Sequence, residues 1–215
     1  MELQELTAWV QTLDKEFAPI REAARELVSA RPHQECLELA MEWYQQEPYQ
    51  LRQLAVYVMG ELAAQYPSVL DYLREQVSLD PNWKVQDDLA RAFDRYCKLT
   101  GYEKALPEIQ RWMSHPRATV RRAAAEGLRV WTSRPYFKQN PQLAVEMLAA
   151  LREDESDRVR RSAGSALGDI GRKHPEAVRQ EISRWDDSDP RQQAVQKLAA
   201  KYLPPEPSEK DAQND

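Results

Sequence analysis

The sequence predicts an all-α fold, a right-handed α-solenoid of about six helix pairs. The 215 residues include only six glycines and no strand-like run of alternating apolar and polar residues. Apolar residues instead recur at intervals of three and four, as at Leu51, Leu54, Ala55 and Val58, and these positions share one face of a helix. A motif that returns about every 35 residues is typical of stacked helix pairs.

Proline marks most of the expected helix starts, because its fixed φ angle suits the first turn and it has no N–H to donate. The prolines in this role are Pro32, Pro48, Pro67, Pro81, Pro116, Pro175 and Pro190. With the apolar spacing they predict about twelve helices, over residues 2–13, 18–30, 33–46, 49–65, 68–78, 83–99, 102–114, 117–132, 141–151, 156–172, 176–185 and 190–202.

The repeated motif opens with an acid, His or Ser, usually followed by Pro. An aliphatic anchor comes next, usually followed by a basic or amide residue, and then small apolar residues. The anchors are Leu51, Val85, Val120, Val159 and Ala194, at separations of 34, 35, 39 and 35 residues. A period near 34 also suits tetratricopeptide arrays, but their Trp, Tyr and Pro positions do not recur here. The Asp/Pro–Val–Arg–Ala pattern therefore favours HEAT-like repeats, in which each helix pair needs its neighbours to bury its apolar face.

The expected organisation is a single repeat domain over residues 1–203. Residues 204–215 are polar and rich in proline, a composition that predicts a disordered tail. Of the whole chain, 42% is hydrophobic and 30% is charged, which is enough apolar material for a core beneath a charged surface. Nothing in the sequence demands an oligomer, and we expect a monomer.

The formal net charge is −5, so no overall positive field draws the chain to nucleic acid or to membranes. The first residues lack the basic and apolar regions of a signal peptide, and no stretch approaches the roughly 20 apolar residues of a membrane span. We expect a soluble, cytoplasmic protein. Cys36 and Cys97 are then small buried side chains in a reducing compartment, with a single disulfide as the alternative.

Neither a metal nor another cofactor is expected. His33, His115 and His174 are far apart, and His115 and His174 each precede a helix-opening proline. No Ser/His/Asp cluster, phosphate-cradling glycine loop or nucleophile elbow is present.

Basic residues are numerous in the second helix of each pair, which lines the concave face of a solenoid. They are Arg52, Lys84, Arg91, Arg121, Arg122, Arg129, Arg158, Arg160, Arg161 and Lys197. In one interpretation, members such as Arg121, Arg158 and Arg160 pair with Asp of the neighbouring repeat and form a structural ladder. In the other, they form a basic strip that follows a phosphate backbone. Composition leaves both open.

One constellation suggests chemistry. Trp83 and Asp87 lie four residues apart at a helix start and so share one face, and Arg122 occupies the matching place one unit later. Equivalent positions on stacked units are neighbours, so the three side chains are expected to converge. An aromatic plane, a carboxylate and a guanidinium suit cleavage of a glycosidic bond at a sugar-phosphate. The structural alternative is a packed Trp, an acid that favours the helix dipole and one more ladder arginine.

These residues carry a resemblance to the HEAT-like-repeat DNA alkylation repair proteins, the AlkD-like alkylpurine DNA glycosylases. The segment NWKVQDD resembles the Trp–x–x–x–Asp segment of that family, and the match continues through QRWMSHPRATVRRAA. Trp112 falls where the family has a structural Trp. The segments FAPIREAARELVSA, EWYQQEPYQLRQLAVYVMGEL and DRVRRSAGSALGDIGRKHPEAV extend a looser resemblance over roughly residues 17–203.

The resemblance implies a hydrolase that cradles alkylated duplex DNA on its concave face. Active members excise positively charged N3- and N7-alkylpurines without a metal and without drawing the base into a pocket, unlike most glycosylases. By matching positions, Asp87 would be the catalytic carboxylate, Trp83 a contact to the deoxyribose and Arg122 a contact to phosphate or lesion. The expected DNA-binding residues are Lys84, Arg121, Arg158, Arg160, Arg161 and Ser165.

The chain departs from the family pattern at Ser165, which stands where the family has a second concave-face Trp. It is also acidic where active members tend to be basic, and the resemblance implies that part of the first helix pair is missing. A non-catalytic relative that binds unusual DNA structures, and a HEAT adaptor that binds protein, therefore stay open beside the glycosylase.

Overall fold

The structure is a computed structural model that describes residues 2–14, 17–129 and 131–205. The chain divides into two compact units, Met1–Leu128 and Arg129–Asp215. Every regular element in the described residues is helical, as predicted. Most of the tail expected to be disordered, residues 206–215, lies outside the described part of the chain.

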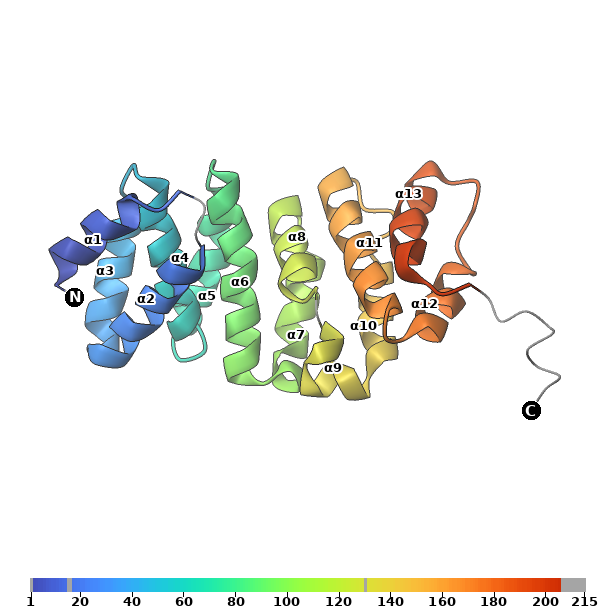
Figure 1. The fold of residues 1–215 in the computed structure, drawn as a ribbon, viewed down its shortest axis with the longest axis horizontal. Coiled ribbons are helices and arrows are strands. Elements are labelled where there is room, and N and C mark those ends of the chain that lie inside the picture. The colour runs from blue at the N-terminus through green and yellow to red at the C-terminus, as the bar shows by residue number, and fades with distance from the viewer. Residues whose placement is uncertain (1, 15–16, 130, 206–215) are drawn as a thin grey trace. The chain divides into compact units, whose positions relative to one another are not determined.

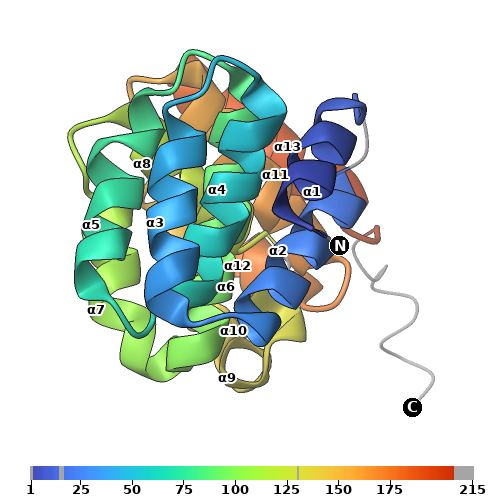
Figure 2. The same ribbon diagram turned by 90° about the vertical axis from the view of Figure 1, so that its left-hand side faces the viewer.

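Apart from the end of α8, the helices of the first unit follow the predicted ranges within a few residues. They are α1 (Leu3–Gln11), α2 (Phe17–Ala30), α3 (His33–Tyr44), α4 (Tyr49–Leu62), α5 (Pro67–Glu75), α6 (Trp83–Thr100), α7 (Tyr102–Met113) and α8 (Ala118–Gly127), with a 3-10 turn η1 (Val77–Leu79) between α5 and α6. Helix α6 packs between α4 and α8, while α3 packs on α4 and α7 on α8 (Figure 1). Helices α1 and α2 both pack against α4 (Figure 2).

The core of this unit is built from the apolar stripe of each helix. Phe93 on α6 stacks on Trp112 of α7, with ring centroids 3.9 Å apart, and both side chains are fully buried. Where α6 and α8 approach each other, Gly127 faces the backbone of Ala90, and a Cβ at Gly127 would lie only 2.4 Å from the Ala90 carbonyl oxygen. The absence of a side chain at Gly127 therefore permits this helix contact.

We expect Gly127→Ala to lower the free energy of unfolding by about 1–3 kcal/mol, because the added methyl group must push α8 away from the rigid backbone of α6. Urea unfolding followed by circular dichroism measures the change. Thr119→Ala on the same helix is the control, since it leaves the contact between Gly127 and Ala90 untouched. Equal stability of Gly127→Ala and the wild type would show that the two helices are not held this closely.

The second unit contains five further helices and two 3-10 turns in its described residues. They are the 3-10 turn η2 (Trp131–Ser133), α9 (Pro135–Gln139), α10 (Pro141–Ala149), α11 (Asp157–Gly171), α12 (Pro175–Ile182), α13 (Pro190–Ala199) and the 3-10 turn η3 (Ala200–Tyr202). Helix α11 is central, with α10 and α12 packed against it and α13 in close contact along its length. Trp131 and Phe137 fill the core beside α10 with ring centroids 4.5 Å apart.

Three details differ from the sequence predictions. The helix expected over residues 117–132 ends at Gly127, and the short helix α9 lacks a long apolar period and was not predicted. The predicted anchor Ala194 is exposed, and the buried anchor of the last repeat is Gln192. A polar residue can be buried at this anchor because its amide has hydrogen-bond partners. The Gln192 amide donates to Glu153 Oε1 (2.9 Å) and accepts from the Asp186 N–H (3.0 Å).

The basic or amide residue after each anchor has a recurring structural role. Its side chain reaches back and donates to carbonyl oxygens five or six residues earlier, as Arg121 Nη1 does to His115 (2.7 Å) and Pro116 (2.8 Å). The residues with this contact are Arg52, Gln86, Arg121, Arg160 and Gln193. They donate to carbonyl groups in the loop that leads into the second helix of each pair. These carbonyl groups would otherwise lack hydrogen-bond partners.

Both cysteines are free and buried, as the first of the two interpretations of Cys36 and Cys97 predicted. Burial raises the pKa of both thiols. None of the helices in the described part of the chain is long and apolar enough to cross a membrane.

Candidate nucleic-acid interface

The start of α6 is positioned by a polar loop. The Asn82 side chain accepts from the Lys84 N–H (2.9 Å) and caps the helix. Before it, the buried carboxylate of Asp80 accepts from Arg52 Nε (2.8 Å) and from the Asn82 N–H (2.8 Å). The Arg52–Asp80 pair joins consecutive repeats as the ladder interpretation expected, and it sets the first turn of α6, where Trp83 stands.

The exposed face of α6 and α8 carries the predicted constellation. Arg122 Nη2 on α8 donates to Asp87 Oδ1 on α6 at 2.8 Å, so the structure brings these two side chains together. The ion pair is open to solvent, since 34% of the Asp87 side chain and 17% of the Arg122 side chain are exposed. Trp83, one turn before Asp87, is 59% exposed. We refer to Trp83, Asp87 and Arg122 as the α6–α8 site.

Directly behind this site lies a buried carboxylate that the sequence analysis missed. Asp88 is fully buried and accepts from Gln53 Nε2 (2.6 Å) and Tyr57 Oη (2.5 Å) of α4, and from Arg91 Nη1 (2.9 Å) one turn later on α6. The Arg91 guanidinium lies 4.9 Å from the centre of the Phe17 ring. These bonds hold α6 against α4 at the level of Asp87, and they keep Arg91 on Asp88.

Burial raises the pKa of Asp88 to about 6, because the loss of water outweighs the hydrogen bonds from Tyr57, Gln53 and Arg91 that favour the charged form. The same burial, with the nearby Asp88 charge, raises the pKa of Tyr57. The burial of Asp88 could have been predicted from the sequence, because Asp88 stands three residues after the anchor Val85 and so lies on the buried face of α6.

Lys84 lies near the α6–α8 site, but its ammonium group is engaged within the fold. Lys84 Nζ donates to the carbonyl oxygen of Asp14 (2.7 Å), to Asp14 Oδ1 (3.1 Å) and to Tyr49 Oη (2.8 Å). These bonds raise the pKa of Lys84 and fasten the segment after α1 to α4 and α6. A role of Lys84 in DNA binding stays a prediction, and it would require these contacts to open.

The remaining predicted DNA-binding residues fall into two groups. Arg121 and Arg160 hold the loops before their helices, as described above. On α11, Arg161 pairs with Asp157 (2.8 Å) yet stays 74% exposed, and Arg158 is exposed without an ion pair to any residue in the described ranges. Ser165, on the same helix, is partly exposed. Arg158 and Arg161 therefore present charge to solvent, whereas Arg121 and Arg160 serve the fold.

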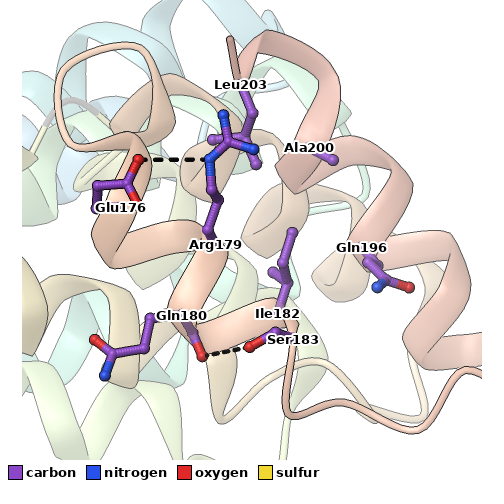
Figure 3. A pocket seen from close by; sticks show the side chains of 8 residues that line it. All are labelled: Glu176, Arg179, Gln180, Ile182, Ser183, Gln196, Ala200 and Leu203. Atoms are coloured by element: carbon purple, nitrogen blue, oxygen red, sulfur yellow. Dashed lines mark hydrogen bonds and ion pairs between the residues drawn. The ribbon is translucent and has the colours of Figure 1, made fainter. Parts of the chain in front are cut away.

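The second unit contains an open cavity of about 580 Å³ between α12 and α13 (Figure 3). Its lining residues are Glu176, Arg179, Gln180, Ile182, Ser183, Gln196, Ala200 and Leu203. Glu176 Oε1 lies 3.6 Å from Arg179 Nε, so the charged groups of the lining offset each other. None of the residues predicted to bind DNA lines this cavity. Within the described residues, no group of three or more His, Cys, Asp or Glu side chains could hold a metal ion.

Together, the fold and the α6–α8 site define a helical-repeat protein that offers an aromatic ring, a carboxylate and a guanidinium on one exposed face. The chain belongs to the DNA alkylation repair enzyme family, whose sequence profile it matches over residues 16–203. This match confirms the family suggested by the sequence, and with the structural matches it confirms the all-α solenoid.

Two solved structures from Streptococcus mutans are similar over nearly the whole chain. The structure of AlkD2 shares 39% identity, covers 93% of this chain and 98% of its own, and superposes with a TM-score of 0.89. The structure of smu.31 from strain UA159 shares 40% identity, covers 93% and 100%, and has a TM-score of 0.85. A predicted DNA alkylation repair enzyme from Enterococcus faecalis, 18% identical with a TM-score of 0.66, shares the fold.

A curated relative, the uncharacterized protein YhaZ of Bacillus subtilis, is 30% identical over 166 residues. The aligned region covers 71% of this chain but only 45% of YhaZ, so the chain spans less than half the length of that relative.

Proposed function

We propose that this protein is a monofunctional DNA glycosylase that excises cationic N3- and N7-alkylpurines from duplex DNA at the α6–α8 site. The observation that carries the proposal is the solvent-open contact between Asp87 and Arg122, one helical turn from the exposed ring of Trp83. Membership of the DNA alkylation repair enzyme family supports DNA as the substrate.

In the proposed reaction, a water molecule attacks C1′ of the damaged nucleotide as the bond from C1′ to the purine nitrogen breaks. The electron pair of that bond moves to the purine and neutralises its positive charge, so the leaving base needs no general acid. The carboxylate of Asp87 stabilises the oxocarbenium-like carbon and accepts a proton from the water. The products are a free alkylpurine and an abasic site.

The other two side chains would position the substrate. The Trp83 ring offers an apolar plane for the deoxyribose, and the Arg122 guanidinium can bind a phosphate through two parallel hydrogen bonds. Because Arg122 is paired with Asp87 in the free protein, an incoming phosphate must compete for the guanidinium. That exchange would release the Asp87 carboxylate to face the cationic lesion. Arg158 and Arg161 are the exposed cations of α11 that we propose as further phosphate contacts.

A second candidate function, DNA binding without catalysis, is favoured by the same ion pair. In the free protein Arg122 partly neutralises Asp87, and Ser165 stands where the family pattern has an aromatic wall of the lesion site. If Arg122 keeps its hold on Asp87 when DNA is bound, the carboxylate has less negative charge to offer to a developing cation.

The two functions are separated by measuring binding and base release on one substrate. Duplex DNA that contains 7-methylguanine is incubated with the protein, released base is quantified by chromatography, and affinity is measured across salt concentrations. Release of 7-methylguanine, with binding that weakens steeply as salt rises, is the expected result. Salt-dependent binding without release would leave the non-catalytic function. Absence of both would overturn the two DNA functions and leave the protein-binding adaptor.

We expect Ser165→Trp to strengthen binding to alkylated duplex about five-fold or more, because stacking of one base on an aromatic ring contributes roughly 1–3 kcal/mol. The measurement is the ratio of affinities for alkylated and unmodified duplex. Ser165→Ala removes the hydroxyl group without adding a ring and is the control. A Ser165→Trp variant that binds no better than Ser165→Ala would count against a lesion site completed by an aromatic residue at this position.

A further inference from the structure

The end of the second unit carries a cluster of positive charge that no assigned role uses. Helix α11 ends at Gly171, Arg172 follows it, and the turn η3 packs on this end of the helix. The contact is close because a Cβ at Gly168 would lie 2.7 Å from the Leu198 carbonyl oxygen and 3.6 Å from the Tyr202 ring. Gly168 therefore allows Tyr202 to reach Arg172.

Two cations gather around one phenol group. The Arg172 guanidinium carbon lies 3.7 Å from the centre of the Tyr202 ring, and Lys201 Nζ lies 5.0 Å from it. The neighbouring cations Lys201 and Arg172 lower the pKa of Tyr202. The cluster is open to solvent, since 54% of the Arg172 side chain and 39% of Tyr202 are exposed, and Lys201 is exposed as well.

Acidic groups offset this charge only in part. Asp169 is 3.9 Å from Arg172 Nη2, but it already accepts from Arg129 Nε at 2.8 Å. Lys201 makes no ion pair with any residue that the structure describes. Residues 190–203 contain three basic side chains, with Lys197 one turn before Lys201, and no acidic one, in a chain whose net charge is −5. The cluster thus concentrates positive charge in a protein that is acidic overall.

We propose that Arg172, Lys201 and Tyr202 form a phosphodiester-binding site for the backbone of duplex DNA, separate from the α6–α8 site. An arginine fork, an ammonium group and a phenol O–H are three donors that belong to one exposed cluster, and a phosphate oxygen bound there would relieve the repulsion between the two cations. Contacts of this kind hold DNA without reading its sequence. The inference rests on the DNA-binding part of the proposed function and not on its chemistry.

The test compares Arg172→Gln/Lys201→Gln with Lys104→Gln/Arg111→Gln, a control that removes the same two charge types from exposed positions on α7. Affinity for an unmodified duplex is measured between 50 and 200 mM salt. We expect the first variant to bind about five-fold or more weakly at the lower salt, and the slope of log affinity against log salt to become shallower by about 1. The control variant keeps the wild-type affinity and slope.

A second measurement reports on the site directly. With carbon-13 in the tyrosine rings, addition of duplex DNA should shift the Tyr202 signal, which Tyr202→Phe identifies by its loss. If the wild type binds DNA, but the double variant matches its control and the Tyr202 signal does not move, the phosphodiester site is overturned while the proposed function stands. If the wild type binds no DNA, both fall.

Discussion

Replacement of Asp87 by Asn is expected to slow the release of 7-methylguanine by about two to three orders of magnitude, the usual effect of removing one electrostatic partner of a transition state. The amide has the same shape as the carboxylate and can still accept a hydrogen bond from Arg122, so the fold is expected to be retained. It has no negative charge for the developing positive charge at C1′, and it cannot accept the proton of the attacking water.

The measurement is a single-turnover rate with enzyme in excess, so that slow product release does not mask the chemical step. Asp157→Asn is a matched control, because Asp157 is also an exposed carboxylate paired with an arginine, Arg161, at 2.8 Å. Duplex affinity of both variants should equal or exceed the wild-type value, because each substitution weakens the competition for an arginine that we propose as a phosphate contact. Release by Asp87→Asn at the wild-type rate would remove Asp87 from the mechanism.

Asp88→Asn is expected to remove a change of about 3 kcal/mol in the free energy of unfolding that the wild type shows between about pH 4 and pH 6. The pKa of Asp88 is raised from 3.8 to about 6 in the folded protein, so between these values the folded state binds more protons than the unfolded state. The free energy of unfolding therefore falls as pH rises from about 4 to 6, at 1.36 kcal/mol for each unit of the pKa difference. Asn cannot titrate, so the variant should lack this component.

Urea unfolding between pH 4 and pH 7.5 measures the effect as the difference between wild type and variant at each pH. Asp71→Asn is the control, because Asp71 also pairs with an arginine three residues later, Arg74 at 2.6 Å, but is 59% exposed. If the wild-type and Asp88→Asn curves run parallel, the carboxylate behind the α6–α8 site is not held in a dry environment.

The repeat architecture could be predicted because it depends on local patterns. Four of the five predicted anchors, Leu51, Val85, Val120 and Val159, are buried, and the spacing between units placed Asp87 and Arg122 on neighbouring helices. The exception, Ala194, shows the limit of an apolar pattern. A glutamine can fill an anchor position when neighbouring groups form hydrogen bonds with its amide. The local sequence does not predict those hydrogen-bond partners.

Residue type alone was a poor guide to the basic residues. Lys84 and Arg158 look equally suited to phosphate in the sequence, yet Lys84 binds Asp14, 70 residues away, while Arg158 stays exposed. Arg121 and Arg160 are held by carbonyl oxygens of their own loops. A contact over such a sequence separation, or to backbone groups of a loop, depends on where the helices pack, and spacing within one helix does not encode it.

The order of the amino acids alone specified a stack of helix pairs, because burying one apolar stripe per helix is a property of three- and four-residue spacing. It also specified that an acid and an arginine one repeat apart would be neighbours. The tertiary structure determined which of two adjacent carboxylates is exposed and which is buried. The helix turns about 100° between Asp87 and Asp88, so the first meets solvent and Arg122 while the second is sealed against α4.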